Sequence, residues 1–314
     1  AVIGWYKRRY GVDLEADEIT SVNGSQEGLA HIGLTLFNPD DICLVPAPCY
    51  PIFEIGPFLS GAHIEYYHLM EENNYELDLD SIPEDIAYKA KAILVSYPAN
   101  PVSAAVRPEF YPKLIAWAKK YNVIVIHDNA YSEMTFDGYE GTSFLAFEGA
   151  KEVGVEFNSL SKAYNLTGAR ISFCIGNKQI ISEFKKLRSQ IDYGVFLPVQ
   201  YAAVAALNSP MDNIINNREE YRRRREVLSK EFGEAGWPVK LSTGSMFMWT
   251  RIPEKYKSSN DFVMDLMEKT GVIVTPGSAF GEDGEGYARL ALTHSVEEIK
   301  EAAKAIKESG IFSK

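Results

Sequence analysis

Short apolar runs alternate with amphipathic stretches between residues 15 and 180, and this alternation strongly limits the folds open to the chain. The apolar runs predict strands at 19–22, 42–46, 63–68, 92–97, 123–127, 153–158 and 171–175. The stretches between them predict helices at 25–36, 51–59 and 108–121. Because strands that alternate with helices form βαβ units, we expect an α/β fold with a mostly parallel seven-stranded-type sheet sandwiched by helices.

The pattern changes after about residue 210. A long charged helix is predicted at 211–234, and the segments after it predict short strands near 239–241, 245–251, 272–275 and 288–292 and helices near 260–269 and 296–309. This arrangement is typical of a smaller α+β unit. We therefore expect a large domain over 1–210 and a small C-terminal domain over 211–314, which a chain of 314 residues accommodates.

The charge balance argues against nucleic-acid and membrane partners. The formal net charge is −11, so the chain as a whole repels polyanions and acidic membrane surfaces. Four consecutive arginines at 222–225 have acidic neighbours at helical spacing, which predicts a solvated helix face rather than a binding patch. No apolar run approaches the roughly 18 residues that a membrane-spanning helix needs.

The three cysteines, Cys43, Cys49 and Cys174, show no spacing typical of a zinc site or a disulfide framework. We expect them to be buried small hydrophobes in a protein of a reducing, cytoplasmic compartment, and we expect no metal site. The sequence starts without Met in what reads as the middle of an amphipathic helix. We therefore expect an N-terminal part of the natural protein to precede residue 1.

The segment NSLSKAYNLTGAR at 158–170 is the most informative for chemistry. It follows a predicted strand and contains Lys162, Arg170 and three hydroxyl residues, Ser159, Ser161 and Thr167, but no acid. Arginine and hydroxyls suit an anionic group such as phosphate, and a lysine eight positions before the arginine can address another part of the same ligand. A merely polar connection remains an alternative on composition alone.

Other polar residues follow predicted strands and therefore belong to the same edge of the sheet. Ser25 and Gln26 open a predicted helix, so their backbone N–H groups either cradle an anion or form an ordinary capped turn. Asp128 is either a helix cap or a counter-charge for a cationic ligand, and His127 beside it either supports Asp128 or is a satisfied core histidine. Tyr131 follows Asp128, Asn100 lies in a turn between prolines, and Tyr50 is a core aromatic or a stacking platform.

Taken in order, the segments GSQ, PCYP, PANP, DNAY, SLSK with an arginine eight residues after its lysine, and YARLA resemble the pyridoxal-phosphate-dependent aminotransferases of class I/II, fold type I. The resemblance covers nearly the whole chain. It implies pyridoxal 5'-phosphate as cofactor, amino acids and 2-oxo acids as substrates, and a cytoplasmic homodimer. It further implies that Lys162 forms the Schiff base with the cofactor and then moves a proton as general base and acid.

The resemblance also implies roles for the other residues. Asp128 would pair with the protonated pyridine nitrogen, and Tyr131 and Asn100 would bind the phenolic oxygen. Tyr50 would stack on the ring. The phosphate would be held by Ser25, Gln26, Ser159, Arg170 and, with less weight, Ser161. Arg289, within YARLA, would bind the substrate α-carboxylate with two hydrogen bonds, so that substrate binding closes the small domain.

Two features depart from the family pattern. The asparagine motif reads PANPVSA rather than PNNPTG, which changes the turn around Asn100. Family members also carry several dozen residues before the point where this sequence starts. Two alternatives stay open at this point: a carbon–sulfur β-lyase of the same fold, which would use the same Lys162, Asp128 and Arg170, and a non-catalytic cofactor-binding sensor module.

Overall fold

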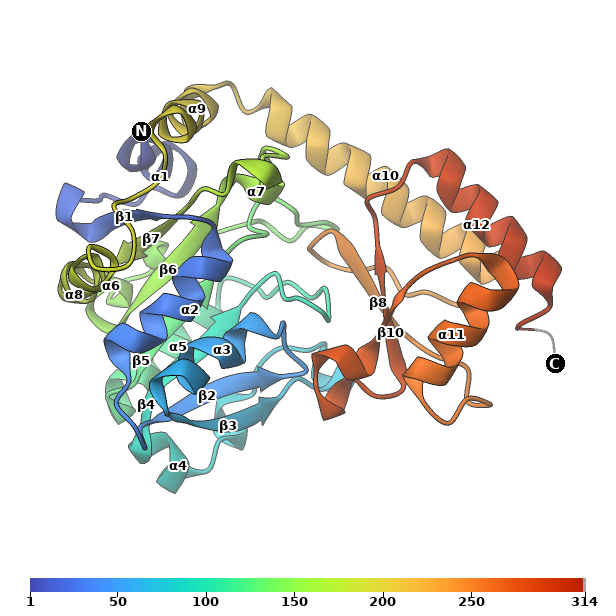
Figure 1. Ribbon diagram of the computed structural model, residues 1–314, viewed down its shortest axis with the longest axis horizontal. Helices are drawn as coiled ribbons and strands as arrows, with labels where there is room; N and C mark the ends of the chain where they lie inside the picture. Colours follow the sequence, from blue (N-terminus) through green and yellow to red (C-terminus); the bar gives the residue numbers. More distant parts are fainter. Residues whose placement is uncertain (313–314) are drawn as a thin grey trace.

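The computed structural model describes residues 1–312, which form two sheets with their helices (Figure 1). The large sheet has seven strands in the order β1-β7-β6-β5-β4-β2-β3. Its strands are β1 (Ile19–Val22), β2 (Ile42–Ala47), β3 (His63–His68), β4 (Ala90–Ser96), β5 (Ile124–Asp128), β6 (Gly154–Ser159) and β7 (Ser172–Gly176). The five strands from β6 to β3 run parallel, whereas β7 and β1 pair antiparallel. The predicted α/β fold with a mostly parallel sheet is therefore confirmed.

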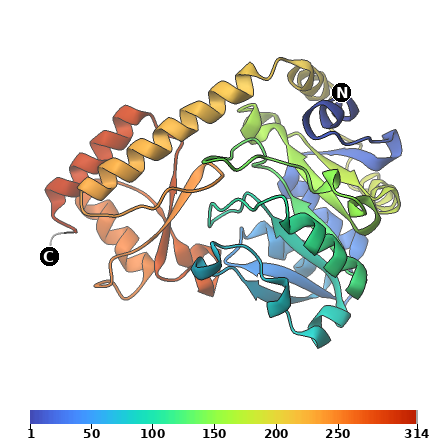
Figure 2. The same cartoon turned by 180° about the vertical axis from the view of Figure 1, so that it is seen from behind.

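Helices cover both faces of the large sheet because successive strand residues point to opposite faces. In β4, Ala92 and Leu94 belong to one apolar cluster, whereas Ile93 and Val95 belong to the other. The first cluster includes side chains of α2 (Ser25–Leu36), α3 (Ile52–Ser60) and α8 (Lys178–Arg188). The second includes α1 (Val2–Tyr10), α4 (Glu84–Lys89), α5 (Phe110–Tyr121), α6 (Ala150–Val153), α7 (Leu160–Ala163) and α9 (Leu197–Asn208) (Figure 2).

Helices α2 and α3 approach closely at two glycines. A Cβ atom on Gly33 would lie 2.2 Å from the carbonyl oxygen of Gly56, so no larger residue fits at that crossing. The close contact holds α2, whose first residues face the sheet edge, firmly against its neighbour.

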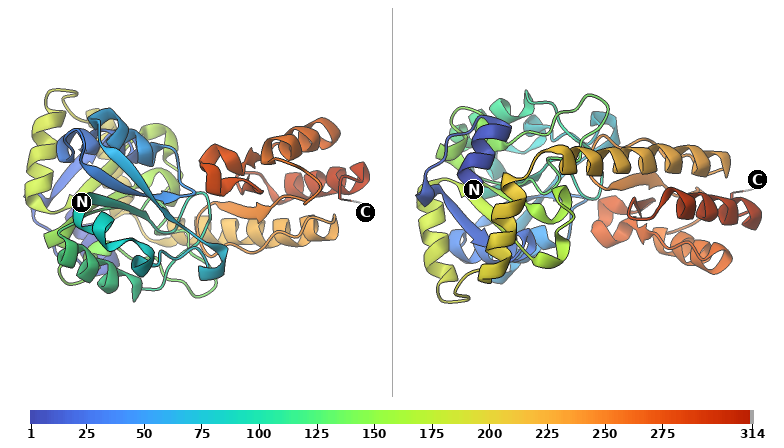
Figure 3. Two further views of the ribbon diagram at one scale, coloured as in Figure 1. Left: turned by 90° about the horizontal axis from the view of Figure 1, so that it is seen from below. Right: turned by 90° about the horizontal axis from the view of Figure 1, so that it is seen from above.

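The second sheet has three strands in the order β8-β10-β9, and its strands are β8 (Phe247–Arg251), β9 (Thr275–Pro276) and β10 (Tyr287–Ala291). Helices α10 (Asp212–Glu234), α11 (Ser259–Thr270) and α12 (Val296–Ser309) pack with it around an apolar cluster of their own. Helix α10 starts beside the large sheet and runs to the small one, which gives the molecule an elongated outline (Figure 3). None of the helices described is both long and apolar enough to cross a membrane.

Two predicted strands are wrong. The segment 239–241 joins no sheet; the Ser229 hydroxyl donates to the Val239 carbonyl at 2.6 Å, and the Thr250 hydroxyl donates to the carbonyl of the preceding Pro238 at 3.0 Å. The predicted strand at 272–275 contributes only Thr275–Pro276, where it pairs with β10. Helices α8 and α9, which the apolar runs did not indicate, fill the segment before α10.

The arginine run is only partly a solvated face. Arg222 and Arg223 are exposed and pair with glutamates at helical spacing, as predicted. Arg225 is instead fully buried, with Nη2 2.6 Å from Oδ2 of Asp137 and its guanidinium over the ring of Phe136. The sequence prediction is wrong for this residue because α10 turns one side of the run toward the loop after β5.

Candidate active site

A cavity of about 210 Å³ lies where the carboxyl ends of β4, β5 and β6 face the small sheet. It is lined by Ser25, Gln26, Leu29, Tyr50, Ile52, Asn100, Asp128, Ala130, Tyr131, Ser159, Ser161, Lys162, Thr167, Arg170, Phe247 and Arg289. The set contains every site residue expected from the sequence. Residues from segments far apart in the chain thus meet at one edge, as ligand-binding residues of open parallel sheets do.

One part of the cavity is built for an anion. Helix α2 starts directly after Gly24, whose φ of 89° is open to glycine and strained for other residues. A Cβ atom at this position would lie 2.3 Å from Nη2 of Arg170, so the guanidinium packs against the bare backbone. The Ser25 hydroxyl is buried and has no hydrogen-bond partner within residues 1–312. Unpaired helix N–H groups, a free hydroxyl and a guanidinium together form an anion-binding cradle.

Two serines on the neighbouring segment face the same cavity. The Ser159 hydroxyl oxygen caps α7, accepting from the Ser161 backbone N–H at 3.1 Å, and also accepts from the Ser172 hydroxyl at 2.9 Å. Its own proton is therefore available to a ligand. The Thr167 hydroxyl donates to the Ser161 carbonyl at 2.9 Å and so fixes the loop that carries Arg170.

Lys162 lies in the single turn of α7, half-buried in the cavity. Burial lowers the pKa of its amine, and the positive charges of Arg170 and Arg289 lower it further, against an opposing effect of Asp128. A lowered pKa makes the neutral, nucleophilic amine more accessible. The turn is fixed by Asn217 of α10, whose Nδ2 donates to the Lys162 carbonyl at 3.0 Å.

Asp128 ends β5 as a buried carboxyl, and its Oδ1 has no hydrogen-bond partner among the described residues. Burial raises its pKa to about 6, although His127 and the Ala130 N–H act in the opposite direction. A buried carboxylate oxygen without a partner calls for a cationic or N–H-bearing ligand group.

His127 points to the opposite face of the sheet from Asp128. Its Nδ1 lies 3.0 Å from Oε2 of the fully buried Glu156, and its Nε2 lies 3.5 Å from the Tyr111 hydroxyl. Glu156 also accepts from the hydroxyls of Tyr6 and Ser143. His127 is thus a satisfied core histidine, one of the two readings left open by the sequence.

Arg289 reaches the cavity from β10 of the small sheet. Its Nη1 donates to Oδ1 of Asn100 at 2.8 Å, and its guanidinium lies 4.0 Å from the ring centre of Phe247 and 4.6 Å from that of Phe280. Its Nε is buried and has no hydrogen-bond partner in the described part of the chain. The two phenylalanine rings and the hydrogen bond to the Asn100 side chain hold the guanidinium in place. Its remaining N–H groups can bind a carboxylate.

The two tyrosines differ in their surroundings. The Tyr50 hydroxyl lies 3.3 Å from Oε1 of Gln26, at the start of α2. Tyr131 is buried, and burial followed by the charge of Asp128 raises its pKa, so that it remains a neutral hydrogen-bond donor.

Three residues that shape the site were not predicted from the sequence. Phe247 and Phe280 flank Arg289, and Asn217 fixes the backbone of Lys162. The motifs TGSMFMW and PGSAFG point to loops near the substrate, which is a signal for the two phenylalanines. Asn217 carries no such signal, because nothing in the sequence of the long helix α10 sets it apart from the polar residues around it.

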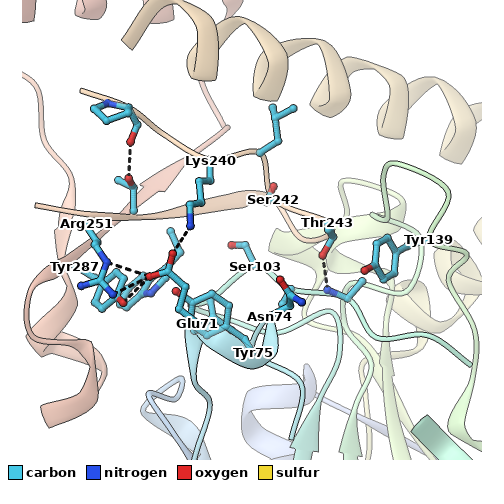
Figure 4. A pocket seen from close by; sticks show the side chains of 17 residues that line it. Glu71, Asn74, Tyr75, Ser103, Tyr139, Lys240, Ser242, Thr243, Arg251 and Tyr287 are labelled. Atoms are coloured by element: carbon cyan, nitrogen blue, oxygen red, sulfur yellow. Dashed lines mark hydrogen bonds and ion pairs between the residues drawn. The ribbon is translucent and has the colours of Figure 1, made fainter. Parts of the chain in front are cut away.

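A second cavity, of about 400 Å³, contains none of the predicted residues (Figure 4). Glu71 lies at one side of this cavity, in a connection between elements of the large sheet. It accepts hydrogen bonds from Arg251 Nε at 3.0 Å and from the Tyr287 hydroxyl at 3.1 Å, and it also forms an ion pair with Lys240. Lys240 and these other donors outweigh burial and lower the pKa of Glu71 to about 2. Glu71 therefore ties the two sheets together beside the site.

The whole chain was compared with known proteins. Residues 1–306 match the family model for class I and II aminotransferases. LL-diaminopimelate aminotransferases of Halothermothrix orenii and Aquifex aeolicus are each 45% identical to the chain, covering 99% and 98% of it and 80% and 79% of their own lengths. Substrate-bound BacF from Bacillus subtilis superimposes with a TM-score of 0.95 at 34% identity, over 98% of this chain and 78% of that one. A probable N-succinyldiaminopimelate aminotransferase from Thermus thermophilus gives 0.92 at 34% identity, over 98% and 82%.

Proposed function

The chain belongs to the class I and II aminotransferases, enzymes that depend on pyridoxal 5'-phosphate, and we propose that it transfers an amino group from LL-diaminopimelate to a 2-oxo acid. The relatives named for this substrate support the donor, with identities of 40–45% over 96–99% of the chain. The observation that carries the catalytic assignment is the meeting of Lys162, Asp128 and Arg170 in one cavity.

The hydrogen-bonding groups of the cavity fit pyridoxal 5'-phosphate. The unpartnered Ser25 hydroxyl, the first N–H groups of α2, the Ser159 hydroxyl and the Arg170 guanidinium match a phosphate. The unpartnered Oδ1 of Asp128 matches a protonated ring nitrogen. Bound there, pyridoxal 5'-phosphate supplies an aldehyde that takes up amino groups and a ring that withdraws electrons from the substrate Cα.

In this proposal Lys162 carries the cofactor and, once released, moves a proton to and from the substrate Cα. Its lowered pKa suits that exchange because the amine must lose its proton to act as a base. Asp128 holds the proton on the ring nitrogen. Asn100 has its Oδ1 bound by Arg289, so its Nδ2 would be the group that, with Tyr131, holds the cofactor's phenolic oxygen.

The substrate carboxylate is assigned to Arg289. Because Arg289 comes from β10 and binds Asn100 after β4, one ligand held there bridges the two sheets. We propose that domains 1–210 and 211–314 close on the substrate and exclude water from the reacting atoms.

Removing the Arg289 side chain is expected to raise the KM for the amino donor about 100-fold while the cofactor stays bound, since a paired guanidinium–carboxylate contact is worth roughly 3 kcal/mol. Steady-state kinetics of Arg289→Ala and the absorbance of its cofactor measure both effects. Arg223→Ala is the control, because Arg223 is an exposed arginine of α10 and does not line the cofactor cavity. Loss of cofactor from Arg289→Ala would contradict the assignment.

A screen of half-reactions tests the donor. The purified yellow enzyme is mixed with single amino acids, and conversion to the aminated cofactor is followed by absorbance. LL-diaminopimelate is expected to convert the cofactor fastest. Faster conversion by an aromatic or aliphatic amino acid would overturn this donor and leave the aminotransferase activity intact. Steady release of a 2-oxo acid without any acceptor would instead indicate β-elimination.

We also propose a homodimer. The segment before and within α9 exposes large apolar side chains, namely Ile191, Tyr193, Phe196, Leu197, Tyr201 and Val204. A continuous group of this kind is typical of a surface that another protein covers. A monomeric mass in sedimentation at micromolar concentration would contradict this proposal. The three free, buried thiols support a reducing, cytoplasmic location.

A further inference from the structure

We propose that Arg188 is a positioning residue for the phosphate-binding turn at residues 23–25, and that Asp192 couples this turn to the exposed aromatic segment after α8. The inference rests on the proposed role of that turn in holding the cofactor phosphate. Arg188 does not line the cofactor cavity, so it acts only through its neighbours.

Arg188 ends α8 as a nearly fully buried arginine, with 5% of its surface exposed. Its Nη2 donates to both carboxylate oxygens of Asp192, at 3.0 and 2.8 Å. Its Nη1 donates to the Ser21 carbonyl in β1, and its Nε lies 3.6 Å from Oε1 of Glu27 in α2. Arginine suits this place because its planar guanidinium bonds the Ser21 carbonyl and the Asp192 carboxylate through Nη1 and Nη2 while its charge faces Glu27.

Both carboxylates beside Arg188 also hold Asn23. Glu27 Oε2 accepts from the Asn23 backbone N–H at 2.9 Å, and Asp192 Oδ2 accepts from its side-chain Nδ2 at 3.2 Å. Asn23 is therefore fixed through both its backbone and its side chain. The buried guanidinium neutralises the two acids and keeps them in the positions that Asn23 requires.

Asn23 directly precedes the anion cradle. The next residue, Gly24, has its φ of 89° and packs against Arg170, and after it comes the unpartnered hydroxyl of Ser25. A rotation of the peptide at Asn23 would move the first N–H groups of α2 and the contact with Arg170 together. The position of the phosphate donors thus depends on a network that the phosphate does not touch.

Asp192 connects the same network to the surface. Its Oδ1 accepts from the Gly194 N–H at 2.8 Å, which shapes the turn that presents the fully exposed Tyr193. The Asp192 carboxylate bonds Arg188, Asn23 and Gly194 at the same time. An ordered exposed segment and an ordered cradle therefore require the same position of Asp192. Coupling of this kind is reciprocal.

The test compares two ligands that differ only in the phosphate. Apo-protein is titrated with pyridoxal 5'-phosphate and with pyridoxal, for the wild type, Arg188→Met and Asp192→Asn. We expect the Kd for pyridoxal 5'-phosphate to rise at least about tenfold in Arg188→Met, and less in Asp192→Asn, while the Kd for pyridoxal changes less than about twofold. The kcat at saturating cofactor should stay close to that of the wild type, because no group that touches substrate is changed.

Arg224→Met is the matched control. Arg224 also joins a carboxylate, Glu220 at 2.9 Å, to a backbone carbonyl, Leu292 at 3.1 Å, but in the small-sheet part of the chain. It should leave both dissociation constants unchanged. Equal weakening of both ligands, or no weakening, in folded Arg188→Met or Asp192→Asn would overturn the positioning role. A wild type that binds both ligands equally would instead refute the phosphate cradle itself.

Discussion

Lys162→Ala is expected to lose about 10⁴-fold or more in turnover of the amino donor, with the fold intact. The cavity contains one lysine, and that amine both carries the cofactor and moves the proton. No other lining residue can do the first task, and Tyr131 is a poor base because burial raises its pKa. Steady-state kcat measures the loss, and circular dichroism establishes that the chain still folds.

Lys178→Ala provides the control for this change. Lys178 is exposed at the start of α8 and lies outside the cavity, so its variant should keep full activity. Reduction of the holoenzyme with borohydride, followed by peptide mapping, should place the cofactor on Lys162. A label on a different lysine, or substantial turnover by Lys162→Ala, would contradict the assignment.

Asp128→Asn is expected to slow the half-reaction with the amino donor about 10³-fold, because an amide cannot stabilise a protonated ring nitrogen as a carboxylate does. The effect should appear in kcat rather than in KM, since Asp128 does not belong to the carboxylate-binding group around Arg289. Stopped-flow absorbance measures the step directly. An unchanged rate would remove Asp128 from the role proposed here.

The same substitution has a second signature in the apo-protein. Burial raises the pKa of Asp128 from 3.8 to about 6, so between these values the folded chain holds a proton that the unfolded chain has released. The contribution of Asp128 to the free energy of unfolding of the wild type therefore falls as the pH rises from 4 to 6. Asp128→Asn escapes this loss, so its free energy of unfolding relative to the wild type should increase by about 3 kcal/mol over that window. Urea unfolding at pH 4 and pH 7 measures the change, and a constant difference would show that the carboxyl ionises freely.

Local patterns predicted the strands of the large sheet and several helices of both parts of the chain to within a few residues. The helices at 25–36 and 296–309 coincide with α2 and α12, and the strands at 19–22 and 63–68 coincide with β1 and β3. These elements are readable because burial on one or both faces imposes a period of 3.6 or 2 on the apolar residues. The segment 239–241 was predicted as a strand from the same kind of pattern but joins no sheet, because a local pattern does not say whether a neighbouring strand is in place to pair with it.

The candidate residues could likewise be named from the sequence, since most of them follow an apolar strand and all of them belong to motifs that occur in order. The sequence did not decide between the alternative roles of several of these residues. Successive residues of β5 point to opposite faces, so Asp128 lines the cavity and His127 contacts the buried Glu156 on the other face. The sequence alone does not show which of the two neighbours faces the cavity.

The sequence by itself predicted the seven strands of the large sheet and named the candidate site residues, because strands and motifs both depend on residues close together in the chain. The tertiary structure alone decided which of these groups lack partners, which charges lower the pKa of Lys162, and that Arg188, Asp192 and Asn23 form one network behind the cradle. Most of those properties arise from contacts between segments far apart in the chain, such as Asn23 with Asp192 and Lys162 with Arg289, and long-range packing sets them through burial and geometry rather than through local pattern.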